Sequence, residues 1–154
     1  ILGTTLLLIF GLAPAAIGLA VGLLLQGSLF ALPDLPQYGI NVTTLLVPLF
    51  ATSLLAKKII PAATPYVDIR YGQALKLSVA YQGGIVVWVA FWAFYGQGVG
   101  AENLSEVLAF GSVYMSVIII EPLIDLGLLA AAKFLNGLRN TMFVEKRLYS
   151  GSQA

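Results

Sequence analysis

The sequence predicts an all-α protein, a polytopic transmembrane helical bundle with about five membrane segments in this stretch, the first of them partial. Hydrophobic residues make up 59% of the 154 residues, charged residues only 10%, and residues 1–56 hold a single charged side chain, Asp34. A soluble domain carries roughly 25% charged residues. Lipid offers no hydrogen-bond partner to the backbone, so long apolar runs of this kind form membrane helices.

The first two predicted segments meet at a break in the helix. Residues 1–10 are too short for a span, which takes about 20 residues, so we expect the end of a longer helix that begins before Ile1. Gly11 and Pro14 interrupt it, and proline suits the first turn of a new helix. The second segment covers residues 14–32. The two prolines and the glycine of the stretch that follows exclude a regular helix there.

Three further segments complete the prediction. Asn41, an acceptable N-cap, opens the third over residues 41–56, and Lys57 and Lys58 end it. The fourth, residues 73–95, gathers aromatic residues in its last turns, as is typical where a helix leaves the bilayer. The fifth, residues 104–134, can span and protrude. We therefore predict one transmembrane domain over residues 1–134 and a basic tail over residues 135–154.

Basic residues are distributed unevenly between the loops, which predicts the orientation. They flank the connector between the third and fourth segments, or follow the fifth segment: Lys57, Lys58, Arg70, Lys76, Lys133, Arg139, Lys146 and Arg147. The opposite loops hold only Asp34, Glu102 and Glu106. By the positive-inside rule the connector and the C-terminal tail lie in the cytoplasm.

A pair of carboxylates in the fifth segment is the most informative polar feature. Glu121 and Asp125 are four residues apart and so share one helical face, with Pro122 between them. Ionisable residues at membrane depth are functional candidates. Lys76 is expected at a depth similar to that of Asp125. The pair therefore predicts a buried ion pair, a hydrogen-bonded anchor between the fourth and fifth segments, or a role in substrate passage or coupling to a partner.

Gly18 and Gly22 form a GxxxG motif in the second segment. Small residues at this spacing let helices approach closely in lipid. The motif predicts tight packing within the bundle, with a docking face for a partner subunit as the alternative.

Several function classes find no support in the composition. The chain has no Cys and no His, so it lacks a disulfide, a thiolate metal site, the commonest metal ligand and the usual base at neutral pH. Its net charge of +1 is too small to indicate a nucleic-acid partner. We find no nucleophile–base pair and no phosphate-binding glycine loop, and we predict that the protein is not an enzyme.

Several motifs together resemble a known family. They are Leu2-Gly3 with Gly11 and Pro14-Ala15-Ala16, then LLLQGSLF at residues 23–30, and Tyr38-Gly39-Ile40-Asn41. The stretch from Gly111 to Glu121 adds to the likeness. Over residues 1–133 the chain resembles the substrate-binding membrane subunit (S component) of energy-coupling-factor cobalt/nickel ABC transporters, of the CbiM/NikM type, in a divergent bacterial branch. The order of LLLQGSLF and GIN is the most specific element.

The resemblance implies uptake of Co²⁺ or Ni²⁺ as substrate across the bacterial cytoplasmic (inner) membrane, for cobalamin or nickel-enzyme supply. Metal would be captured on the outer side, with a second transmembrane subunit and ATPases as partners. The family's metal ligands are its N-terminus and a histidine, and the matching positions fall upstream of Ile1. No metal ligand is therefore expected within this stretch as given. Asn41 is carried over as a group that positions the loop or the ligands.

Two other hypotheses remain open at this point. The chain could be a structural subunit of a larger membrane complex that reuses the fold without transport. It could also be a proton- or ion-coupled carrier that uses Glu121 and Asp125, in which case uptake would fail when either becomes neutral.

Overall fold

The computed structural model describes residues 2–138, and all regular secondary structure in this range is helical. The helices are α1 (Gly3–Phe10), α2 (Leu12–Phe30), α3 (Tyr38–Ile59), α4 (Tyr71–Gln97) and α5 (Ala101–Leu138), with short 3₁₀ helices η1 (Leu32–Gln37) and η2 (Tyr66–Asp68). The regions of α2, α3, α4 and α5 are long and apolar enough to cross a membrane. The predicted all-α polytopic bundle, with a short first segment, is confirmed.

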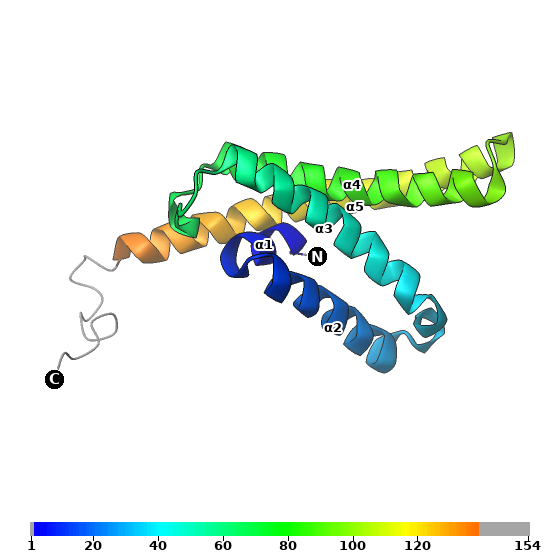
Figure 1. Ribbon diagram of the computed structural model, residues 1–154, viewed down its shortest axis with the longest axis horizontal. Helices are drawn as coiled ribbons and strands as arrows, with labels where there is room; N and C mark the ends of the chain where they lie inside the picture. Colours follow the sequence, from blue (N-terminus) through cyan, green and yellow to red (C-terminus); the bar gives the residue numbers. More distant parts are fainter. Residues whose placement is uncertain (1, 139–154) are drawn as a thin grey trace.

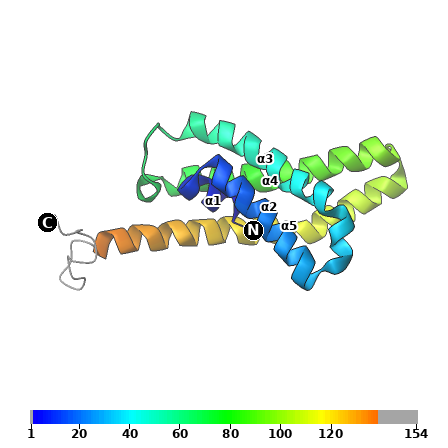
Figure 2. The ribbon, with the colours of Figure 1, turned by 60° about the horizontal axis from the view of Figure 1, so that its bottom comes forward.

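The long helices form two antiparallel pairs. Helices α2 and α3 make one hairpin and α4 and α5 the other, while α3 packs along α4 and joins the pairs (Figure 1). The α3–α4 connector and the last turns of α5 lie at one end of the bundle, which we call the connector end. The α2–α3 and α4–α5 turns lie at the opposite end, the hairpin end. Helix α1 contacts all four long helices and lies among them (Figure 2).

Glycines with positive φ produce two of the helix breaks. Gly11, with φ of 85°, separates α1 from α2, and Gly98, with φ of 79°, ends α4. Glycine adopts this conformation without the steric cost that other residues meet. Beyond Gly98, the Asn103 side chain donates hydrogen bonds to the carbonyl oxygens of Ala93 (3.0 Å) and Gly98 (2.6 Å), which satisfies the end of α4.

Close approach of backbones shapes the apolar core. A Cβ added at Gly84 of α4 would lie 3.0 Å from Cβ of Pro48, so glycine allows α3 and α4 to pack tightly there. A Cβ at Gly3 would collide with the ring of Tyr81. Around these contacts the core consists of Leu7, Ala15, Leu19, Leu49, Tyr81 and Ile85.

Polar side chains are turned inward and large apolar ones outward. Most of the buried polar residues come from α1, α3, α4 and α5: Thr4, Thr5, Thr52, Ser53, Ser78, Gln82, Asn103, Glu121 and Asp125. Leu29, Phe30, Val87 and Val113 are among many exposed apolar residues. This arrangement suits a bundle surrounded by hydrocarbon, where a polar group needs a protein partner.

Three predicted boundaries need correction. The prediction that Asn41 caps a helix is wrong, because η1 runs directly into α3, which begins at Tyr38 and places Asn41 about one turn inside. Lys57 and Lys58 lie in the last turn of α3 rather than beyond it. Helix α5 continues to Leu138, so the first residues of the predicted tail are helical, and residues 139–154 lie outside the described residues.

The prediction that the GxxxG motif of α2 packs tightly within the bundle is wrong for the described residues. Gly18 and Gly22 are exposed, and a Cβ at either would meet nothing within 4 Å in the part of the chain that the structure describes. Helix α2 instead packs through Ala15, Leu19 and Gly27. The alternative, a docking face for a partner subunit, stays a prediction.

The Gly3–Tyr81 contact generates a test of the fold. Gly3→Ala should lower the free energy of unfolding by about 1–3 kcal/mol, the usual cost of overpacking a core. Thermal denaturation of the full chain in detergent measures it. Gly83→Ala is the matched control, because a Cβ there meets nothing within 4 Å. Equal stability of the two variants would contradict this packing of α1 against α4.

Candidate functional site

The Asp125 carboxyl group joins three helices. Thr5 of α1 donates a hydrogen bond of 2.5 Å from Oγ1 to Oδ1 of Asp125, and Ser78 of α4 donates one of 2.6 Å from Oγ to Oδ2. Asp125 is 2% exposed. Thr5 and Ser78 are also buried. Both carboxyl oxygens are therefore satisfied within the bundle, and the two hydroxyls fix α1 and α4 to the same turn of α5.

Glu121 lies one turn before Asp125 on the same face of α5 and meets the beginning of α1. It is 2% exposed. Its carboxyl group accepts backbone hydrogen bonds from Leu2 and Gly3. The first N–H groups of a helix have no partner within the helix and carry its positive dipole end, so a carboxyl group stabilises them. The two predicted carboxyl groups thus hold both the start and the middle of α1.

Lys76 does not form an ion pair with Asp125, which was one of the predicted alternatives. It is exposed on α4, and the Asp125 oxygens accept hydrogen bonds from Thr5 and Ser78 instead. Among the alternatives predicted for Glu121 and Asp125, the structure therefore contains the hydrogen-bonded anchor between α4 and α5 and not the ion pair. Lys133, farther along α5, donates a hydrogen bond of 2.6 Å to the Val67 carbonyl oxygen and so ties the connector to α5.

Hydroxyl groups around the carboxyl pair were missed by sequence reasoning. Besides Thr5 and Ser78, the buried Tyr81 lies within electrostatic range of Glu121 and Asp125. In the connector, Tyr66 approaches the side chain of Thr5 closely enough to hydrogen-bond. Isolated hydroxyl residues within otherwise apolar helices were the available signal, but the sequence does not reveal which of them face a carboxyl group on another helix.

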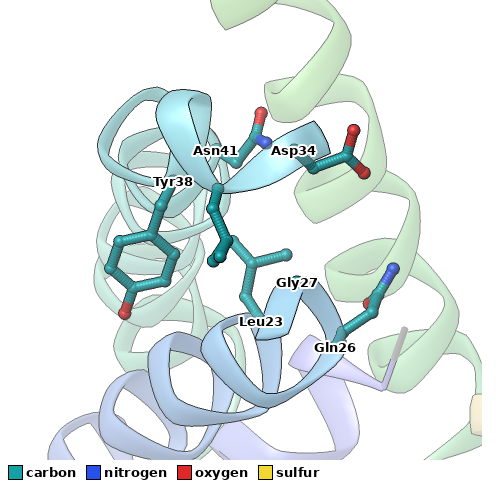
Figure 3. Close-up of a pocket in the computed structure, with 7 residues that line it drawn as sticks. Leu23, Gln26, Gly27, Asp34, Tyr38 and Asn41 are labelled. Carbon is teal, nitrogen blue, oxygen red and sulfur yellow. The ribbon is translucent and has the colours of Figure 1, made fainter. Parts of the chain in front are cut away.

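Asn41 lines a small pocket at the hairpin end. The pocket has a volume of about 20 Å³, and its walls are Leu23, Gln26, Gly27, Asp34, Leu35, Tyr38 and Asn41. The side chains of Gln26, Asp34 and Asn41 stand around it, whereas the Tyr38 ring points away (Figure 3). The Tyr38 hydroxyl donates a hydrogen bond of 3.0 Å to the Ala20 carbonyl oxygen, which holds α3 against α2.

The donor set of this pocket is small for a transition metal. Asp34 offers one carboxylate and Gln26 and Asn41 offer amide oxygens, whereas Co²⁺ and Ni²⁺ favour nitrogen ligands such as imidazole. Across residues 2–138, no group of three or more His, Cys, Asp or Glu side chains could hold a metal ion. The pocket residues can therefore orient a loop or contact a hydrated cation, and they do not by themselves supply the ligands that Co²⁺ or Ni²⁺ favours.

The fold and these buried polar groups define a polytopic membrane protein whose interior holds polar side chains beside an apolar core. Comparison with protein families assigns it further: a family model described as "CbiM: Cobalt uptake substrate-specific transmembrane region" matches residues 1–140. The chain belongs to this family, which is one of membrane components for cobalt uptake and not of enzymes. The resemblance found in the sequence is confirmed at the level of the family.

No curated protein and no solved structure gives a significant match.

Proposed function

We propose that this chain is part of the metal-binding membrane subunit of a Co²⁺ or Ni²⁺ uptake system in the bacterial cytoplasmic membrane. The observation that carries the proposal is the family match over residues 1–140 on a bundle with four candidate spans. A second transmembrane subunit and ATPases would complete the transporter, and the metal would serve cobalamin or nickel enzymes. Membership of an uptake family disfavours the alternative of a structural subunit without transport.

Charge at the two ends of the bundle supports capture of cations at the hairpin end. Asp34 and Glu102 lie at or near the hairpin turns, and Glu106 lies in the early part of α5. Lys57 and Lys58 lie at the connector end. The positive-inside rule places the connector end in the cytoplasm and the acidic hairpin end outside. Acidic groups raise the local concentration of cations and speed their arrival.

The pocket around Asn41 is proposed to position the outer loop that receives the metal. Residues outside this pocket are proposed to bind the metal directly. Asn41 lies about one turn inside α3 and lines the pocket together with Gln26 of α2 and Asp34 of η1. An amide at this place can hydrogen-bond a metal-binding residue or a loop without binding the metal itself.

Metal binding by the full-length protein tests this function. Titration calorimetry with Co²⁺ and Ni²⁺ should detect binding, and Asn41→Ala should weaken it by about 10–100-fold, the usual effect of a lost outer-shell group. Gln37→Ala is the matched control, because Gln37 is an exposed residue at the end of η1 that does not line the pocket. Absence of binding, together with metal accumulation that is unchanged on gene deletion, would contradict the uptake function and favour the structural alternative.

Labelling of single cysteines tests the orientation. The chain has no Cys, so Asp34→Cys and Lys58→Cys can each be introduced alone. A membrane-impermeant maleimide applied to intact cells with a permeabilised outer membrane should label the first variant and spare the second. Lysis should make the second reactive. Labelling of position 58 from outside would contradict both the orientation and uptake from the hairpin end.

A further inference from the structure

A cleft opens at the connector end of the bundle, opposite the pocket around Asn41. Its volume is about 400 Å³, which lies within the range of ligand-binding clefts. The break between α1 and α2 forms one side of the cleft, and the end of α3 with the connector forms the other. Both sides lie away from the hairpin turns (Figure 1). The proposed capture of metal at the hairpin end does not use this cleft.

The lining of this cleft has a basic part and an apolar part. Lys57 is exposed at the end of α3, and among the described residues that line the cleft it is the only charged one. Ser53 stands one turn before Lys57 on the same face of α3 and is 6% exposed. Leu7 and Leu8 line the opposite side from α1. The cleft therefore combines a positive charge, a hydroxyl and an apolar wall.

The charge of the cleft comes from lysine rather than from its other polar groups. Thr64 also lines the cleft, but its hydroxyl donates a hydrogen bond of 2.8 Å to the Pro61 carbonyl oxygen. The N-terminal end of α2 and the C-terminal end of α3 both border the cleft, so their dipoles, which have opposite signs there, offset each other. Lys57, with the exposed Lys58 next to it, therefore supplies the attraction for an anion.

Helix lengths place the cleft at the level of lipid headgroups. Helix α2 runs from the cleft to the hairpin end with 19 residues, which cover about 28 Å by the usual rise of an α-helix. Helix α3 has 22 residues and covers about 33 Å, with Lys57 in its last turn. Both lengths match the ~30 Å hydrocarbon core of a bilayer. With the hairpin turns at one surface, Lys57 therefore meets the headgroups of the opposite leaflet.

We propose that this cleft binds one anionic phospholipid from the leaflet at the connector end. Lys57 pairs with the lipid phosphate, the Ser53 hydroxyl donates a hydrogen bond to an ester carbonyl oxygen, and an acyl chain lies against Leu7 and Leu8. Basic pockets between transmembrane helices recognise anionic lipid headgroups in this way. The lipid bridges α1, α3 and the connector, where the described side chains leave the cleft open. The proposal rests on the membrane fold and not on metal uptake.

Two other occupants fit this lining less well. A free inorganic anion would pair with Lys57 but leave the apolar wall uncovered, so that wall would contribute nothing to binding. An apolar helix of a partner subunit would cover the wall but enclose Lys57 without a counter-charge, and burying an unpaired charge is costly. An anionic phospholipid supplies both the counter-charge and the apolar surface.

Native mass spectrometry of the full chain in detergent tests the site. Phosphatidylglycerol should bind more tightly than phosphatidylcholine. Lys57→Gln should weaken binding of phosphatidylglycerol about fivefold, the effect of roughly 1 kcal/mol for one basic residue near an anionic surface, whereas Lys57→Arg should keep it. Lys76→Gln is the matched control, because it removes an exposed charge of α4 that does not line the cleft. Equal affinity for the two lipids, or equal losses in the two Gln variants, would overturn the proposal.

A steric variant tests the apolar part of the cleft. Ala56→Phe should fill the cleft and prevent the lipid from binding, whereas Ala51→Phe, the same change on an exposed residue of α3 outside the cleft, should leave binding unchanged. Excess inorganic phosphate should not displace the lipid. Displacement by phosphate, or full binding to a folded Ala56→Phe variant, would overturn the proposal. The Lys57 variants change an exposed side chain, so the first test stands even if Ala56→Phe does not fold.

Discussion

The arrangement of this bundle depends on the Asp125 carboxyl group and the two hydroxyls that it binds. A lipid bilayer offers polar side chains no partner, so a hydroxyl or carboxyl group within the spans is stabilised when another helix or its own backbone hydrogen-bonds to it. The bonds from Thr5 and Ser78 to Asp125 do this for α1, α4 and α5 at once. Glu121, one turn away, adds the backbone at the start of α1.

These anchors explain how an eight-residue helix can hold a fixed place in the membrane domain. An isolated helix of this length is not stable, and most of its stability must come from tertiary contacts. Gly11 then turns the chain into α2, whose far end meets η1 and α3 around the pocket of Asn41. The bundle thereby separates a basic connector end from an acidic hairpin end.

The sequence alone predicted the fold class, the order of the segments and the break near Gly11, because hydrophobic length, glycine and proline act locally. The family followed from motif order. The Asn41 cap was wrong, because it depends on how η1 continues into α3. Of the alternatives for Asp125, the structure has the hydrogen-bonded anchor and not an ion pair, because Lys76 lies on the exposed face of α4. Thr5 and Ser78 were missed because they lie 120 and 47 positions from Asp125 in the sequence, and contacts over such separations leave no local pattern.

A double-mutant cycle between Thr5 and Asp125 tests the central claim most directly. The free energy of unfolding in detergent would be measured for the wild-type protein, Thr5→Val, Asp125→Leu and the double variant, since leucine leaves no acceptor for the Thr5 hydroxyl. Because the pair is wholly buried, we predict a coupling energy of about 1–2 kcal/mol, at or above the typical ~0.6 kcal/mol for hydrogen bonds between membrane helices. Strictly additive effects of the two substitutions would contradict the account.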